Sequence, residues 1–303
     1  MMYSTRRQFL KTTAGFLAVA TSATVFDFKK EKLKLSFSTL GCPDWSFEKI
    51  ADFAVTNGYT GLEIRGIQRQ MDLTKCKEFT DENIGATNRL MKDKGLRFVD
   101  LGSSAEMHHS DDAERRKQMD EAARFIDLAQ KLNCPYIRVF PNKLPKDNRE
   151  ATIDLIVKGL IEAGDRAKGT DVMVLMETHG EVVESAVLKQ IMDSVNHPKV
   201  GLVWDVSNMW TVTKEPPAQV YSTLKKYIHH THIKDATLSD KGPQYKLMGR
   251  GEVPIFEAID ILYKGGYKGY YSFEWEKLWH PEIDEPEVAL TDYPRAMKQH
   301  FGK

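Results

Sequence analysis

The sequence predicts a single-domain α/β protein folded as a closed (β/α)₈ TIM barrel, and three observations support this prediction. From residue 35 onward, eight short β-type runs alternate with helical patterns. Several runs are apolar almost throughout, as is typical of parallel strands that are covered on both faces. An open doubly wound sheet would need a glycine-rich phosphate loop after an early strand, and neither GxGxxG nor GxxxxGK[ST] occurs. Barrels commonly use a chain of this length, 303 residues, for one domain.

The predicted strands follow the apolar runs in chain order. They are 35–40, 61–65, 97–102, 135–140, 172–178, 200–205, 228–234 and 269–275. In a closed parallel barrel all strands point the same way, so we expect their carboxyl ends to meet at one mouth.

Amphipathic helices are predicted between these strands. Apolar residues at positions 153, 156, 157, 160 and 161 keep the spacing of one helix face, and positions 255, 256, 259, 262 and 263 give a similar stripe. Gly58, Gly95 and Gly266 stand just before the next strand, where a helix ends. The longest connections without a helical pattern are 66–80, 235–252 and 275–286, and all three are expected on the rim that carries substrate loops.

Charge and cysteine content exclude some classes of protein. Basic and acidic residues balance at 43 each, and no lysine- or arginine-rich run follows residue 32. A nucleic-acid partner is therefore not expected, because such a partner needs a basic surface. The three cysteines are scattered without CxxC spacing. We interpret them as ordinary thiols, with one disulfide left open.

The N-terminal residues 1–30 are interpreted as a twin-arginine signal segment and linker, and residues 31–303 as the barrel. Arg6 and Arg7 precede a weakly apolar stretch, TTAGFLAVA, followed by small residues suitable for cleavage. This stretch is much shorter than the roughly 20 residues of a membrane-spanning helix. The sequence therefore predicts a periplasmic or otherwise exported protein, without stable membrane insertion once the signal is removed.

Four consecutive apolar runs end on residues that commonly bind metal ions. These are Glu177, Asp205, His232 and Glu274. A carboxylate at the end of a buried strand is costly unless a cation or a hydrogen-bond donor compensates it. Three carboxylates and one imidazole suit a single divalent ion, with Mn²⁺ favoured and Mg²⁺, Co²⁺ or Zn²⁺ as alternatives.

Asp205 also has a second interpretation. An acidic residue after a strand often caps the next helix. Ser207 or Asn208 could provide that cap instead, which would leave Asp205 free for a metal ion.

Several segments resemble the xylose-isomerase-like TIM barrels, which include sugar phosphate isomerase/epimerase-like proteins, ketose 3-epimerases and inosose dehydratases. The resemblance runs from about residue 35 to the end, through ETH at 177–179, WDVSN at 204–208, HIKD at 232–235 and, most specifically, 247–276. It implies the same four metal ligands. It also implies that Glu177 and Glu274 act as the catalytic acid and base.

The sequence departs from the ketose 3-epimerases at two positions. Those enzymes place a substrate-binding histidine three positions after the aspartate ligand, where this chain has Asn208. They place an arginine six positions after the histidine ligand, where this chain has Leu238. A standard free ketohexose is therefore a less suitable substrate than the resemblance alone implies.

Six further residues are predicted to contact or orient a substrate, and most have a structural alternative. Because strand side chains alternate, Glu177 and His179 share one side, as do His232 and Lys234. Lys234 could hold a hydroxyl group or pair with Glu276, and the ion pair is favoured. His108 and His109 are expected on the rim after the third strand, where they could bind a ligand or belong to a lid or an exposed loop. The candidates are His179, Lys234, Glu63, Arg138, Asn208 and Arg250.

These observations predict a metal-dependent isomerase or epimerase that removes a proton next to a carbonyl group through a metal-stabilised enediolate. The alternative is a lyase that eliminates the aglycone from a 3-keto-glycoside, since the same four ligands serve both reactions. A non-catalytic sugar-binding barrel would be expected to lose a ligand. The expected partner is a small sugar or keto-sugar, and the oligomeric state, including a homo-oligomer, is left open.

Overall fold

The computed structural model describes residues 33–302, which form one α/β unit. The predicted export segment lies outside the described residues. Within residues 33–302, no helix is both long enough and apolar enough to cross a lipid bilayer.

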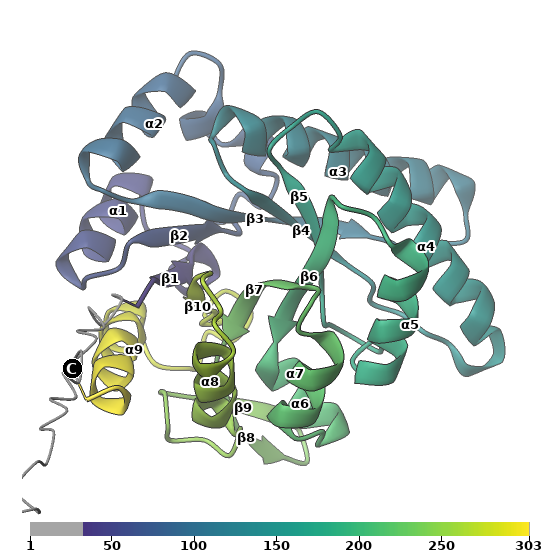
Figure 1. The fold of residues 1–303 in the computed structure, drawn as a ribbon. Helices are drawn as coiled ribbons and strands as arrows, with labels where there is room; N and C mark the ends of the chain where they lie inside the picture. The colour runs from purple at the N-terminus through teal and green to yellow at the C-terminus, as the bar shows by residue number, and fades with distance from the viewer. Residues whose placement is uncertain (1–32, 303) are drawn as a thin grey trace, which may run out of the picture. The chain divides into compact units, whose positions relative to one another are not determined.

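Eight parallel strands close into a barrel, which confirms the predicted fold class (Figure 1). The order around the barrel is β1, β10, β7, β6, β5, β4, β3 and β2, so consecutive β/α units are neighbours in space. The bounds are β1 Leu35–Ser38, β2 Gly61–Ile64, β3 Arg97–Glu106, β4 Tyr136–Phe140, β5 Met173–Glu177, β6 Val200–Asp205, β7 Ile228–Ile233 and β10 Tyr271–Phe273.

Burial on both faces explains why the strands read as continuous apolar runs. All six residues of β6 are buried, as are all four of β1 and of β2. Most strand bounds differ from the prediction by one or two residues, and β10 is shortened at both ends, to Tyr271–Phe273. The largest difference is in β3, which continues to Glu106, and Glu106 pairs with Phe140 of β4. Serines at 103 and 104 interrupt the apolar pattern of β3, so its last residues carried no strand signal.

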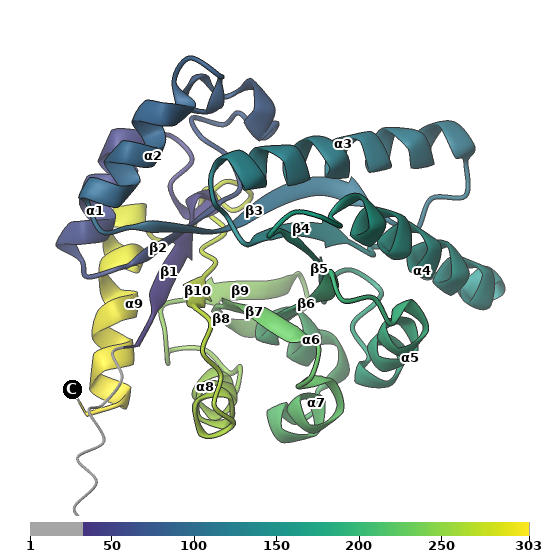
Figure 2. The ribbon, with the colours of Figure 1, turned by 45° about the horizontal axis from the view of Figure 1, so that its top comes forward.

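Helices surround the barrel on its outer side (Figure 2). Their bounds are α1 Phe47–Thr56, α2 Ile84–Asp93, α3 Asp112–Lys131, α4 Arg149–Arg166, α5 Ser185–Val195, α6 Val206–Thr213, α7 Pro217–Leu224, α8 Ile255–Lys264 and α9 Pro286–His300. Short 3₁₀ turns are η1 Thr39–Gly41, η2 Leu73–Lys75, η3 Lys77–Phe79 and η4 Lys146–Asn148.

The predicted apolar stripes face the barrel. On α8, Ile255, Ile259 and Leu262 are buried, whereas Tyr263 is 43% exposed and packs against Phe301. The stripe is therefore narrower than its sequence pattern suggests, because an aromatic residue at the edge of a helix face can pack sideways.

The predicted helix-stop glycines have the left-handed backbone that favours glycine. Gly58, Gly95 and Gly266 have φ values of 80°, 67° and 80°. Each lets the chain reverse directly after a helix and enter the next strand at a fixed angle.

One long connection contains structure that the sequence did not predict. Within 235–252, β8 Asp235–Ser239 and β9 Gly242–Lys246 form an antiparallel hairpin. The hairpin is mostly exposed, so its strands lack the apolar alternation by which strands are recognised. Leu238, the position where the epimerases carry an arginine, is 37% exposed in this hairpin.

A buried tyrosine compensates a proline inside the last helix. Pro294 lies within α9 and has no amide hydrogen for the carbonyl of Leu290, four residues earlier. The hydroxyl of Tyr59, which precedes β2, donates to that carbonyl at 2.6 Å. This bond joins the chain after α1 to α9, which lies beside α1 in Figure 2.

Tyr59→Phe should lower the free energy of unfolding by about 1–3 kcal/mol, because the buried Leu290 carbonyl loses its donor. Chemical denaturation measures this loss. In a Pro294→Ala background the restored amide can bond the carbonyl, so the same substitution should cost less than about 1 kcal/mol. Equal costs in both backgrounds would contradict the assignment.

Candidate metal centre

The four predicted metal ligands come together at the carboxyl end of the barrel. Glu177 ends β5, Asp205 ends β6, His232 lies in β7 and Glu274 directly follows β10. These are four consecutive strands around the barrel, so the side chains form an arc with a glutamate at each end. One ligand atom from each residue lies within 4.8 Å of the other three, and all four residues are buried.

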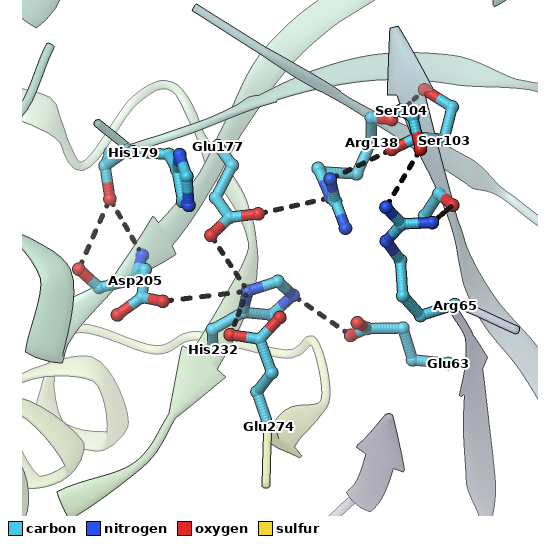
Figure 3. A network of polar contacts seen from close by, with 12 residues as sticks. Glu63, Arg65, Ser103, Ser104, Arg138, Glu177, His179, Asp205, His232 and Glu274 are labelled. Atoms are coloured by element: carbon cyan, nitrogen blue, oxygen red, sulfur yellow. Dashed lines mark hydrogen bonds and ion pairs between the residues drawn. The ribbon is translucent and has the colours of Figure 1, made fainter. Parts of the chain in front are cut away.

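His232 stands at the centre of this arc (Figure 3). Its Nδ1 atom lies 3.2 Å from Glu274 Oε2, 3.5 Å from Glu177 Oε1 and 3.9 Å from Asp205 Oδ2. The imidazole nitrogen and the three carboxylates therefore face a common point.

Glu63 orients His232 from the other side of the ring. Its Oε2 atom lies 3.1 Å from His232 Nε2, and also contacts His230 Nε2 at 3.0 Å and Ser272 Oγ at 2.9 Å. A histidine that binds a metal through one nitrogen commonly uses the other in such a hydrogen bond. Glu63 is fully buried, and its contacts lie on the side of His232 opposite the three carboxylates.

Asp205 combines two functions that the sequence analysis treated as alternatives. Its Oδ1 accepts a hydrogen bond from the backbone N–H of Asn208 at 2.8 Å and thereby caps α6. The expectation that Ser207 or Asn208 would provide the cap is wrong. Because a carboxylate has two oxygens, Oδ2 remains directed at the cluster.

Arg138, one of the candidates for contact with a substrate, contacts a carboxylate of the barrel. Its Nε lies 3.1 Å from Glu177 Oε2, and its Nη1 donates to the Ser103 carbonyl at 2.9 Å. Figure 3 shows Glu177 between Arg138 and His232. Arg65, which the sequence analysis did not single out, is buried nearby and donates to Ser104 Oγ at 2.9 Å. An arginine two residues after a strand glutamate, in an otherwise apolar run, was the signal that could have identified it.

Lys234 is the most densely paired cation of the site. Its Nζ lies 2.7 Å from Asp205 Oδ2, 2.5 Å from Glu274 Oε2 and 2.7 Å from Glu276 Oε1. The predicted pair with Glu276 is present, but Lys234 also contacts two of the four candidate ligands. Tyr245 of β9 donates to the same Glu276 oxygen at 3.0 Å, which ties the unpredicted hairpin to the site.

Neighbouring charges control the ionisation of the cluster. Burial raises the pKa of Asp205 to about 7. Burial acts in the same direction on Glu274, but His232 and Lys234 hold the pKa of that carboxyl well below its usual range. Burial favours a neutral Lys234, yet Asp205 and Glu274 hold its pKa well above the usual value. Glu274 is therefore a carboxylate and Lys234 an ammonium group at neutral pH.

The donor atoms fit a bound cation. Glu177 Oε2, Asp205 Oδ2 and His232 Nδ1 are buried and, within residues 33–302, make ion-pair contacts without a hydrogen bond of normal geometry. Buried polar atoms are seldom left in this condition. Three carboxylates and one imidazole could hold a divalent ion and leave coordination positions for oxygens of a substrate.

Of the remaining substrate candidates, two lie at the cluster and one does not. Asn208 Nδ2 donates to Glu177 Oε1 at 3.3 Å. His179, two residues after Glu177, is partly exposed, and its ring contacts that of Phe140 at a tilt of 49° with centroids 4.6 Å apart. Arg250 is 62% exposed, and the partner found for it is Asp292 of α9 at 3.7 Å, away from the four ligands.

Residues 51–298 match the family of xylose isomerase-like TIM barrels, and the chain belongs to this family. It is 24% identical over 225 residues to a 3-dehydroshikimate dehydratase from Bacillus anthracis, an alignment that covers 71% of this chain and 78% of the dehydratase.

Solved structures show the same fold. A crystal structure of the IOLI protein with a bound zinc atom has a TM-score of 0.72 at 17% identity, covering 88% of this chain and 98% of that one. The D-psicose 3-epimerase from Clostridium cellulolyticum H10, solved with D-tagatose, has a TM-score of 0.70 at 15% identity, covering 89% and 99%. Epimerase and dehydratase chemistry thus both occur among the proteins that this chain resembles.

Lys234→Met should lower the free energy of unfolding by about 3–5 kcal/mol at pH 8 in chelator-treated protein, because it leaves buried carboxylates without their cation. The loss should shrink at pH 5. The pKa of Asp205 is raised to about 7, so at pH 5 this group holds a proton and needs no counter-charge.

Denaturant unfolding at the two pH values measures the effect. Lys264→Met is the matched control, because Lys264 is 75% exposed and pairs with Asp260 at 3.5 Å. An exposed pair of this kind is worth less than about 1 kcal/mol. Similar losses for the two variants would contradict the assigned importance of Lys234.

Proposed function

We propose that the protein is a divalent-metal-dependent enzyme that removes a proton next to a carbonyl group of a sugar or sugar-derived compound, as an isomerase or epimerase. The observation that carries this proposal is the arc of four donors with Glu177 and Glu274 at its ends. Membership of the xylose isomerase-like family supports it.

A bound ion would supply Lewis-acid polarisation of a substrate oxygen. Glu177, Asp205, His232 and Glu274 would hold it, and the oxygen-rich donor set favours Mn²⁺, with Mg²⁺, Co²⁺ or Zn²⁺ as alternatives. Glu63 keeps the Nδ1 atom of His232 directed at this position through its contact with Nε2.

Glu274 serves as the base that accepts the carbon-bound proton. Its pKa is held well below the usual range, so it is ionised at neutral pH and can accept a proton without first losing one. Glu177 stands at the other end of the arc. Burial acts to raise its pKa, but His232 holds that pKa below the usual value, so Glu177 would act as the acid only after it has taken up a proton from solvent. Two carboxylates that approach one carbon from different sides allow a proton to leave on one face and return on the other, which is epimerisation.

His179 binds a substrate hydroxyl. The amide nitrogen of Asn142 donates to Glu106 Oε1 at 2.6 Å, so the amide oxygen faces His179 Nδ1 at 2.8 Å and must accept from it. Nε2 of a neutral His179 then carries the lone pair and can accept a hydroxyl proton. Asn208, with its amide on Glu177, is the second polar group placed for this purpose.

Lys234 favours a second candidate, elimination of a leaving group on the carbon next to the deprotonated one. An ammonium group 2.5 Å from Glu274 can donate a hydrogen bond to a departing oxygen on the same side as the base. The similarity to a dehydratase also supports this reaction. The leaving group would be water, or the aglycone of a 3-keto-glycoside.

The proposal extends to location. The twin-arginine pattern at residues 6–7 supports export to the periplasm. Sugars and keto-glycosides released from glycans are suitable substrates there, and the sequence contains no phosphate-binding loop of a known pattern.

Glu274→Gln should lower turnover about 10²–10⁴-fold, because the amide keeps the shape of the side chain and cannot accept the proton. Proton NMR in deuterated water against a panel of ketoses and keto-glycosides measures the reaction. Deuterium in an otherwise intact sugar indicates an isomerase or epimerase, whereas signals of a dehydrated product or of a free aglycone indicate the lyase.

Glu276→Gln is the matched control. Glu276 also contacts Lys234, but it is not one of the four donors of the arc. The substitution should therefore lower turnover by less than about tenfold. Circular dichroism checks that both variants are folded. Equal turnover in wild type and folded Glu274→Gln would refute the assigned base.

A further inference from the structure

A second group of possible donor atoms lies after the carboxyl end of β3, outside the four-ligand arc. Glu106 is the last residue of β3, and His108 and His109 follow it. Glu106 Oε2 lies 3.0 Å from His109 Nε2 and 3.6 Å from His108 Nδ1. One donor atom from each residue lies within 4.8 Å of the other two. Donor atoms that each lie about 2.0–2.2 Å from one bound ion are separated from one another by distances comparable to these.

The Nδ1 atom of His108 indicates that this group is more than an ion pair. It is buried and, within residues 33–302, has no hydrogen-bond partner. A buried imidazole nitrogen without a hydrogen-bond partner, next to a carboxylate oxygen and a second imidazole, is available to bind an ion.

Glu106 is held in place by a neighbouring side chain. The amide of Asn142 donates to its Oε1 at 2.6 Å, which leaves Oε2 directed at the two histidines. The backbone of Asn142 is itself held, because its carbonyl oxygen accepts a hydrogen bond from the backbone N–H of Glu181 at 2.7 Å. Glu106 is thus held by Asn142, and the two imidazole rings of His108 and His109 contact each other with centroids 4.2 Å apart.

The group opens to solvent at the same end of the barrel as the four-ligand arc. The side chains of Glu106, His108 and His109 are 31%, 13% and 27% exposed, so an ion could enter. Asn142 connects the two places, since it contacts Glu106 through its nitrogen and His179 through its oxygen.

We propose that Glu106, His108 and His109 form a second metal site, which binds a Zn²⁺-like divalent ion. Two imidazoles and one carboxylate are the donor set of many three-ligand zinc sites, and they leave a fourth position for water or a substrate oxygen. This differs from the oxygen-rich set of the arc. The site does not depend on which reaction the arc performs.

The test is zinc stoichiometry of tag-free protein, stripped with chelator, dialysed against micromolar Zn²⁺ and analysed by mass spectrometry of the metal. Wild type should retain two ions per chain. His109→Ala and the isosteric Glu106→Gln should each retain one. Asp205→Asn, which alters the arc, should also lose one ion, and a double variant with His109→Ala should lose both.

His300→Ala is the matched control and should retain two ions. It removes another histidine–carboxylate pair, His300 Nε2 with Asp260 Oδ1 at 2.8 Å, which has no third donor within residues 33–302. Circular dichroism confirms that each variant is folded.

Retention of the wild-type zinc content by folded His109→Ala and Glu106→Gln would overturn the second site. Loss of zinc in these variants, with none lost in Asp205→Asn, would support the second site while contradicting the metal centre of the proposed function. The two proposals therefore fail separately.

Discussion

Three buried carboxylates at one end of the barrel are the constraint on which the rest of the site depends. Glu177, Asp205 and Glu274 would repel one another if each were ionised without compensation. His232 and Lys234 stand among them, and their positive charges hold the pKa of Glu274 low. This arrangement explains why the protein maintains a buried lysine, and why the same carboxylates are available to a divalent ion.

The barrel fold determines where these charged side chains lie and in which direction each one points. Because the four strands are consecutive around the barrel, each contributes one side chain to the same mouth. Outer contacts then fix the direction of each group. Glu63 holds the imidazole of His232, Arg138 holds Glu177, and the N-terminal turn of α6 holds one oxygen of Asp205. The donors are thus oriented by the protein before any ligand arrives.

The sequence was sufficient for the barrel and for the arc, because both follow from local patterns. Eight apolar runs gave eight strands, and the last residue of a run marks the mouth. It was not sufficient for contacts between distant residues. For example, Lys234 contacts Asp205 from the neighbouring strand, and no local sequence pattern predicts which side chains meet across two strands. The β8–β9 hairpin was missed because it is exposed, and Arg250 was misplaced because the path of a long loop depends on what it packs against.

Rules that read one residue at a time also assign each side chain a single role, although one side chain can have two. Asp205 was expected to cap a helix or to face the metal position, and its two oxygens do both. Glu63 was expected to orient a ligand or a substrate, and it contacts the candidate ligand His232 together with His230. Such contacts depend on side-chain geometry across the barrel, which the spacing of residues in the chain does not encode.

Anomalous diffraction from crystals soaked with Mn²⁺ would show whether the four strand ends form one cation site. We expect one strong manganese peak within bonding distance of Glu177, Asp205, His232 and Glu274, with Lys234 moved towards Glu276. A manganese peak elsewhere, or none at this position in crystals with the ion in excess, would contradict the single cation site.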